Sequence, residues 1–337
     1  MTSRERVFAA LRGEPVDRPP VSFWGHSYHR EGSAQALVEA TLEFQREYGW
    51  DWVKLNPRKH YHVEPWGGRY RYSGRPGEKP VAESLPVTGP GDWEKITARP
   101  HDHGALGEQI EAVALLKRGL PPDVPFVETV FTPLAVLGEM AESPAVLRAH
   151  LASHPREVRA ALESVTRTWE RFVPELLRAG ADGIFFATVD WGTRDLLSSD
   201  EYREWARPTD LQVIAAAAGA RFNVLHVCKR NNLLAELADY PVSAFSWAAT
   251  DPTNLSLDAA LARTRAAVMG GISHEGPLLG PDPRAPAAEY RDALARTGGR
   301  RWLVAPGCSI PPATPAANLR AVRDAVESTR LSTQPSA

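Results

Sequence analysis

Short apolar runs alternate with amphipathic stretches along most of this 337-residue chain. The runs are rich in Val, Ile, Phe and Trp, whereas the stretches repeat leucine and alanine at helical spacing. Strands are expected at 21–24, 52–55, 126–131, 183–189, 222–227, 242–247, 266–271 and 302–305. Helices are expected at 34–48, 144–150, 156–179, 202–218, 233–239, 256–265, 286–296 and 315–328. Eight strands, most of them followed by a helix, predict an α/β fold built as a single (β/α)8 TIM barrel.

Some segments fall outside this alternation. Thr2 and Glu5 have the spacing of a capping box and predict a short N-terminal helix. Residues 57–103, rich in Gly, Pro and aromatic residues, are expected to form an excursion after the second strand, with a hairpin at 61–72. We expect one domain over 1–330 and a flexible tail at 331–337. A doubly wound sheet is the alternative, but neither G-x-G-x-x-G nor a P-loop follows the first strand.

Charge and composition exclude several classes of function. A net charge of -2 gives no electrostatic case for nucleic acid or an anionic membrane. No apolar run approaches the roughly 20 residues that span a bilayer, and the charged N-terminus does not resemble a signal peptide. The two cysteines are too few for a disulfide framework, which favours metal binding or catalysis. We therefore expect a soluble cytoplasmic protein.

The expected strands carry metal-capable side chains at their carboxyl ends, where barrel enzymes place their chemistry. His226 and Cys228 stand two residues apart, so they share one face of a strand. Cys308 follows the last strand. One histidine and two cysteines are a known ligand set of catalytic zinc. Each residue alone also fits a hydrogen-bonded core histidine or a small buried cysteine. Together they predict a zinc site.

Other candidate residues follow the remaining strands. Candidate catalytic residues are Asp190, His274 and Glu275. Candidate substrate-binding residues are Trp24, His26, Asn56, Trp191 and Trp247. Asp190 also fits a helix cap, and His274 and Glu275 also fit exposed loop positions. The histidines of the excursion, His60, His62, His101 and His103, are expected in solvent.

The predicted ligand set favours one kind of chemistry. Two thiolates cancel the charge of Zn(II) and leave a soft, neutral centre. Such a centre is a weaker Lewis acid than one held by three histidines. It suits the binding of a substrate thiol, whose sulfur then becomes a nucleophile at neutral pH. The residues thus predict transfer of an alkyl group to sulfur.

Four segments resemble a known family. Residues 4–20, RERVFAALRGEPVDRPP, resemble the opening of the uroporphyrinogen decarboxylase superfamily. Residues 225–228 (LHVC) and 305–311 (APGCSIP) resemble its later strands, and 314–319 (TPAANL) resembles the segment before its last helix. The resemblance covers nearly the whole chain and implies a (β/α)8 barrel.

The superfamily contains two activities, and the residues distinguish them. True decarboxylases carry an Arg-Gln-Ala-Gly-Arg segment after the first strand, whereas residues 22–30 here read SFWGHSYHR. The other branch contains the zinc-dependent, corrinoid-linked thiol methyltransferases of the methylcobalamin:coenzyme M type. This chain resembles that branch, because His226, Cys228 and Cys308 match its zinc ligands. That resemblance implies methyl transfer between a corrinoid, carried by a partner protein, and a small-molecule thiol. Open alternatives are a metal-free decarboxylase-like carboxy-lyase and a non-catalytic corrinoid- or tetrapyrrole-binding relative.

The sequence departs from that branch beside the predicted site. Lys229 stands where relatives often have glycine, and residues 270–275 (GGISHE) replace a Gly-Asn strand end. His274 and Glu275 are therefore candidates for a fourth zinc ligand.

Overall fold

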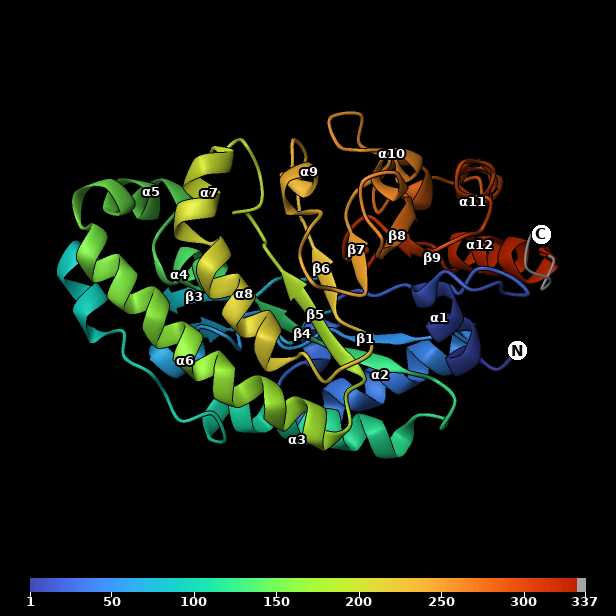
Figure 1. Cartoon of the computed structure of the whole chain (residues 1–337). Coiled ribbons are helices and arrows are strands. Elements are labelled where there is room, and N and C mark those ends of the chain that lie inside the picture. The colour runs from blue at the N-terminus through green and yellow to red at the C-terminus, as the bar shows by residue number, and fades with distance from the viewer. Residues whose placement is uncertain (332–337) are drawn as a thin grey trace.

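A computed structural model describes residues 1–331, in which a curled parallel sheet is covered by helices (Figure 1). Seven strands lie in the order β1-β4-β5-β6-β7-β8-β9, and every neighbouring pair is parallel. The strands of this sheet are β1 Val53–Leu55, β4 Phe126–Phe131, β5 Gly183–Ala187, β6 Val224–His226, β7 Ala244–Ser246, β8 Ala267–Ile272 and β9 Trp302–Pro306. The helices are α1 Ser3–Arg12, α2 Ala34–Tyr48, α3 Gly104–Gly119, α4 Pro133–Met140, α5 Pro144–Ser153, α6 Pro155–Ala179, α7 Ser199–Trp205, α8 Arg207–Ala216, α9 Leu234–Leu237, α10 Leu257–Leu261, α11 Arg284–Thr297 and α12 Ala316–Ser328.

Residues 21–25 occupy the eighth position, between β9 and β1. On one side they form single parallel bridges, Val21 with Val304 and Gly25 with Ile310. On the other side the Val21 carbonyl accepts a hydrogen bond from the Asp51 N–H at 3.0 Å. The predicted (β/α)8 barrel is thereby confirmed. The first predicted strand is, however, an irregular segment whose described residues form only isolated bridges.

Two apolar layers hold the barrel together. Side chains that alternate along the strands point either inward, like Val127 and Phe185, or outward toward the helices, like Phe126 and Phe186. Residues of α1 belong to the inner layer, so this helix packs against the N-terminal end of the barrel. Helix α1 begins with the predicted capping box, in which Thr2 and Glu5 satisfy each other's backbone N–H groups.

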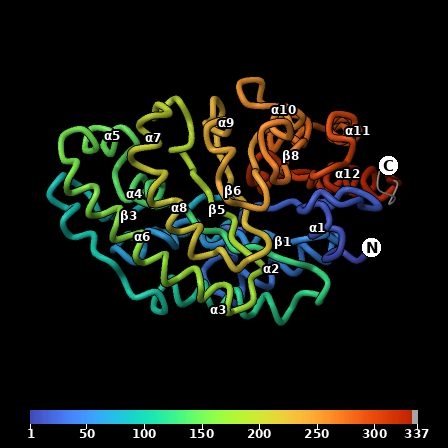
Figure 2. The backbone as a smooth tube through the Cα atoms, viewed as in Figure 1, coloured from blue at the N-terminus to red at the C-terminus, as the bar shows by residue number. Residues whose placement is uncertain are grey.

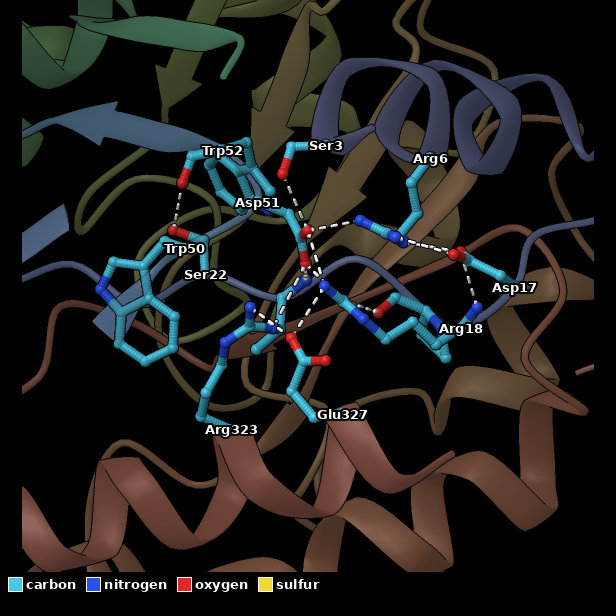
Figure 3. Close-up of polar contacts among 12 residues, drawn as sticks. Ser3, Arg6, Asp17, Arg18, Ser22, Trp50, Asp51, Trp52, Arg323 and Glu327 are labelled. Carbon is cyan, nitrogen blue, oxygen red and sulfur yellow. Dashed lines mark hydrogen bonds and ion pairs between the residues drawn. The ribbon is translucent and has the colours of Figure 1, made fainter. Parts of the chain in front are cut away.

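An ion-pair network fastens the same end (Figure 3). Asp51, fully buried just before β1, accepts hydrogen bonds from Arg6 of α1 at 2.8 Å and from Arg18 at 2.6 Å. The N–H of Val21 donates to the same carboxylate at 2.9 Å. Arg323 of α12 lies alongside, 3.8 Å from Asp51. The network therefore joins α1, β1 and α12 to residues 21–25, which close the barrel and are called the closing segment below.

Several predicted elements differ in detail from the structure. The predicted hairpin at 61–72 is wrong in place: the hairpin of the excursion pairs β2 (Arg69–Arg71) with β3 (Val81–Ser84). The predicted helix 202–218 is two helices, since Pro208 lacks the N–H and the space to continue a helix from the preceding turn. Helices α3 and α4 were not predicted.

The excursion returns to the barrel near α4, where Val87 bridges Ala141 (Figure 2). Contrary to the expectation of solvated histidines, His60 and His62 are buried. Both contact one carboxylate oxygen of Glu139 on α4, at 3.1 and 3.2 Å. Hydrogen bonds from the two imidazoles, together with their charge when protonated, hold the pKa of the Glu139 carboxyl below its usual range, against the effect of burial. These contacts fix the excursion against the carboxyl end of β4.

The first residues and the last described residues lie on the same side of the molecule (Figure 2). Leu331, the last described residue, donates its N–H to the Asp17 carbonyl at 2.9 Å. The rest of the predicted tail, 332–337, lies outside the described residues. Within 1–331, no helix has both the length and the apolar character needed to cross a membrane.

Candidate metal centre

The three predicted metal ligands meet at the carboxyl end of the barrel. His226 is the last residue of β6, Cys228 follows two residues later, and Cys308 follows β9. One ligand atom from each lies within 4.8 Å of the other two. Ideal tetrahedral zinc with usual bond lengths spaces such atoms about 3.6–3.8 Å apart. Only a small movement of side chains separates this arrangement from a metal-binding one.

The imidazole of His226 is held by its surroundings. The side chain is buried, and Nδ1 lies 3.0 Å from the hydroxyl of Ser246 at the end of β7. The ring packs on Phe185 with 5.0 Å between ring centroids. Because Nδ1 is engaged, Nε2 is the nitrogen left to bind a metal. A hydrogen bond to the other ring nitrogen is the usual way to orient a metal-binding histidine.

Each of the two thiols changes the pKa of the other. A hydrogen bond between them lowers the pKa of Cys308 well below its ordinary value and raises the pKa of Cys228 well above it. Burial opposes ionisation of both groups. The pair therefore releases one proton readily and holds the second. A divalent cation bound by both sulfurs would displace that second proton, since thiols bind metals as thiolates. The donor set fits zinc.

The backbone beside Cys228 is strained. Val189, just after β5, has a φ of 48°, and Lys229 has a φ of 70°. A left-handed conformation is rare for a β-branched residue. The backbone amide of Val189 favours the thiolate and so acts to lower the pKa of Cys228. The N–H of Cys228 itself donates to Thr188 Oγ1 at 3.3 Å. Strain of this kind concentrates at functional sites.

The other predicted catalytic residues also lie at the carboxyl end of the barrel, the mouth, but differ in exposure and in their partners. Asp190 forms a 2.7 Å ion pair with Lys229, and both side chains are partly exposed. His274 lies close enough for its charge to lower the pKa of Cys308. Its Nδ1 is buried without a hydrogen-bond partner among the described residues. Glu275 is 75% exposed and 3.7 Å from the His274 ring.

Gly307 makes room for His274. A Cβ on residue 307 would stand 2.8 Å from Ala248 Cα and 3.1 Å from His274 Nδ1. Any larger residue would therefore displace either the β7 loop or the histidine. This position, next to Cys308, brings His274 to the thiol pair.

The predicted substrate-binding residues divide into two groups. Trp24, His26 and Asn56 line a cavity of about 310 Å³ beside the mouth. Trp191 and Trp247 instead lie in the outer apolar layer. Trp247 donates to the Leu255 carbonyl at 2.7 Å. Their burial gives no support to a substrate-lining role.

Sequence reasoning missed Lys54. This residue of β1 points into the barrel and is buried, and its ammonium lies 4.8 Å from the centre of the Phe185 ring. Desolvation lowers its pKa to about 8, although the negative charges of Cys308, Glu128 and Cys228 oppose this shift. A signal existed in the sequence: Lys54 is the one charged residue in an apolar strand, 52–55.

The fold and the site define an α/β-barrel protein with a thiolate-rich cluster suited to a metal. The uroporphyrinogen decarboxylase (URO-D) family profile matches residues 2–329. The chain belongs to that family.

Two sequence relatives and several solved structures extend this comparison. Methylcobamide:CoM methyltransferase MtaA from Methanosarcina barkeri is 25% identical over 343 residues, which cover 95% of this chain and 96% of the relative. The same enzyme from the Fusaro strain is 24% identical, with equal coverage. A methyltransferase structure from Methanosarcina mazei has a TM-score of 0.82 and 24% identity, covering 97% of this chain and 98% of that one. A B12-independent methionine synthase from Shewanella sp. W3-18-1 has a TM-score of 0.60 and 14% identity, covering 94% and 95%.

Proposed function

We propose that this protein transfers a methyl group from a corrinoid, carried on a partner protein, to a small-molecule thiol, with zinc held by His226, Cys228 and Cys308. The observation that carries the proposal is the meeting of two thiols and one imidazole at the mouth of the barrel. The similarity to methylcobamide:CoM methyltransferases along nearly the whole chain supports the same reaction class.

The reaction needs a deprotonated acceptor. A bound zinc would supply an open coordination position at which an incoming thiol loses its proton near neutral pH. The thiolate sulfur then forms a bond to the methyl carbon while the carbon–cobalt bond breaks and leaves both electrons on cobalt. The thiol proton passes to a nearby base or to water.

The residues of the chain have separate roles in this proposal. Ser246 keeps the His226 ring oriented, and the left-handed turn at Val189 aims its amide at Cys228. Asp190 and His274 are the proposed proton acceptors. The two groups differ in how free they are to accept a proton. Asp190 is already paired with Lys229, whereas His274 Nδ1 has no hydrogen-bond partner among the described residues.

His274 is also the better candidate for a fourth ligand when no thiol is bound. Its Nδ1 is buried beside Gly307, next in sequence to Cys308. Glu275 extends into solvent, so its carboxylate would have to give up hydration to reach the cluster. We therefore assign Glu275 to the rim of the site.

Metal content is the first test. We expect about one zinc per chain by elemental analysis of the purified protein, and its loss in Cys228→Ser and Cys308→Ser. The matched control is His103→Gln, since His103 is 78% exposed and remote from the cluster. Circular dichroism reports whether each variant folds.

Turnover is the second test. Methylcobalamin serves as donor and a panel of thiols as acceptors, with loss of the carbon–cobalt chromophore as readout. A folded Cys228→Ser protein that keeps full zinc content would contradict the ligand assignment. Decarboxylation of a carboxylated substrate that survives complete chelation would favour the metal-free carboxy-lyase instead.

A further inference from the structure

The barrel has an open seam between its closing segment and β1. On the N-terminal side of the seam, Ser22 Oγ donates to the Trp52 carbonyl at 2.6 Å. Toward the carboxyl end of the barrel, no ladder bridge among the described residues joins 23–25 to β1. The cavity of about 310 Å³ lies here. It is lined from both sides, by Trp24 and Lys54 of the barrel interior and by Phe44 and Tyr48 of α2.

Most of this cavity is apolar and aromatic. Phe23, Phe44, Tyr48 and Trp50 form one wall, and their rings contact one another at centroid distances of 5.0–5.7 Å. Leu37 and Leu319 complete the wall from α2 and α12. A volume near 300 Å³ with such a lining is at the lower end of small-molecule pockets.

One end of the cavity is polar and cationic. The Lys54 ammonium donates to Asn56 Oδ1, which leaves Asn56 Nδ2 buried without a partner. Among residues 1–331, Lys54 forms no ion pair with a carboxylate. Glu31 is fully buried nearby, but its Oε1 is engaged by His26 at 2.8 Å and by the Ser27 N–H at 2.9 Å. Buried cations are normally paired, whereas the negative charges of Cys308, Glu128 and Cys228 act on Lys54 without a direct ion pair, so a ligand anion has room to supply one.

The same ammonium faces the thiol pair. Lys54 lines the cavity, and the charges of Cys308 and Cys228 both act on it, so its ammonium is near the metal centre as well. An anion that meets Lys54 therefore lies within a few bonds of a sulfur bound at that centre. The rest of such a ligand extends away from the metal centre and packs against the aromatic wall of the cavity.

We propose that this cavity binds the acceptor, and that the acceptor is a thiol carrying an acidic group within a few bonds of its sulfur and an apolar, preferably aromatic, body. The acidic group pairs with Lys54 and accepts from Asn56 Nδ2, while the body packs on the wall formed with α2. The identification as acceptor rests on the proposed methyl transfer, whereas the binding of an apolar anion does not.

The binding test uses probes without sulfur on the metal-free full-length chain. Titration calorimetry compares 3-phenylpropanoate with its neutral isostere 3-phenylpropanamide. The wild type should bind the acid at least roughly tenfold more tightly, as expected for a charge-assisted hydrogen bond. Lys54→Met should abolish this preference and leave amide binding unchanged. Lys79→Met, an exposed lysine of the excursion, is the matched control and should keep the preference.

Two further variants keep the test decisive. Asn56→Asp supplies Lys54 with an internal anion and should remove the preference for the acid even if Lys54→Met fails to fold. Ala40→Phe, which fills the cavity from α2, should weaken both probes. Gln35→Phe, on an exposed position of the same helix, should weaken neither. Equal binding of acid and amide by the wild type, or an acid preference that persists without Lys54, overturns the proposal.

The outcome separates this site from the proposed reaction. If 3-phenylpropanoate binds through Lys54 but the protein takes up no zinc, the cavity assignment holds and methyl transfer fails. If zinc binds and simple thiols are methylated without any acid preference, the cavity assignment fails alone. With both in place, 2-mercapto-3-phenylpropanoate should bind the zinc-loaded protein more tightly than either 3-phenylpropanoate or 2-mercaptopropanoate.

Discussion

At the N-terminal end of the barrel, the buried carboxylate of Asp51 accepts hydrogen bonds from Arg6, Arg18, Ser3 and a backbone N–H. At the opposite end, the buried ammonium of Lys54 has one hydrogen bond and no ion-pair partner among the described residues. Both groups start from the same stretch of chain, 51–54, and differ in which way they face. In barrels, the first end serves stability and the second serves chemistry.

The difference extends beyond these two residues. Asn56 Nδ2, His274 Nδ1 and Glu31 Oε2 are buried at the carboxyl end without hydrogen-bond partners. Among the charged groups of the network at the other end, only one nitrogen of Arg323 is in that state, beside the indole nitrogens of Trp50 and Trp52 that flank Asp51. Unpartnered buried polar atoms are rare in native proteins and call for a reason. Here a bound metal would satisfy His274 Nδ1 and an anionic ligand would satisfy Asn56 Nδ2, so the carboxyl end gives up stability that binding restores.

The largest expected effect comes from removing the Asp51 charge. Asp51→Asn leaves Arg6 and Arg18 buried without their shared carboxylate, and breaking a buried pair in this way destabilises by about 3–5 kcal/mol. We expect that loss in the free energy of unfolding by urea. Asp239→Asn, which removes an exposed partner of Arg207, should change it by no more than about 1 kcal/mol. Equal effects of the two substitutions would contradict the assignment of Asp51 as the centre of the network.

Removing the charge of Lys54 should instead increase the free energy of unfolding. Burial depresses the pKa of Lys54 from 10.5 to about 8, so the folded state holds this proton less tightly than the unfolded state. Below pH 8 both states are protonated and the full penalty applies, roughly 3 kcal/mol. Metal-free, reduced Lys54→Met protein should therefore be more stable than the wild type at pH 7, by up to roughly that amount.

The pH dependence separates charge from packing. Between pH 8 and 10.5 the unfolded wild type keeps a proton that the folded protein has lost, so wild-type stability rises with pH relative to the variant. The gap between the two should close over this window, as measured by unfolding at a series of pH values. Lys79→Met should show no gap at any pH. A gap that stays constant would mean that the methionine simply packs better.

The sequence predicted the barrel because its elements obey local rules. Helix α2 begins and ends where predicted, since Ser33 caps its first turn and Gly49 takes the left-handed conformation that ends it. The excursion was harder, because the burial of His60 and His62 depends on Glu139, which is 77 residues further along the chain than His62. Contacts of that range leave no periodic signal in a sequence.

The same distinction holds for the site. The meeting of His226, Cys228 and Cys308 was predictable, because strand ends come together at the carboxyl end of a barrel. Trp191 and Trp247 were not: a strand-end tryptophan can turn into the pocket or into the core, and both turned into the core. Lys54 was missed because its role follows from the lack of a carboxylate partner among the described residues of the folded barrel, which the sequence alone does not reveal.

The smallest effect tests the strain at the carboxyl end. Asn tolerates the left-handed conformation of Val189 better than a β-branched residue does, so Val189→Asn should relieve strain of about 1 kcal/mol. Val189 also packs partly against the outer core, so Val189→Ala provides the matched control for lost packing. We expect the Asn variant to be more stable than the Ala variant by urea unfolding, with unchanged zinc content, since the amide aimed at Cys228 keeps its place. If Ala were the more stable, the left-handed turn at Val189 would carry no strain.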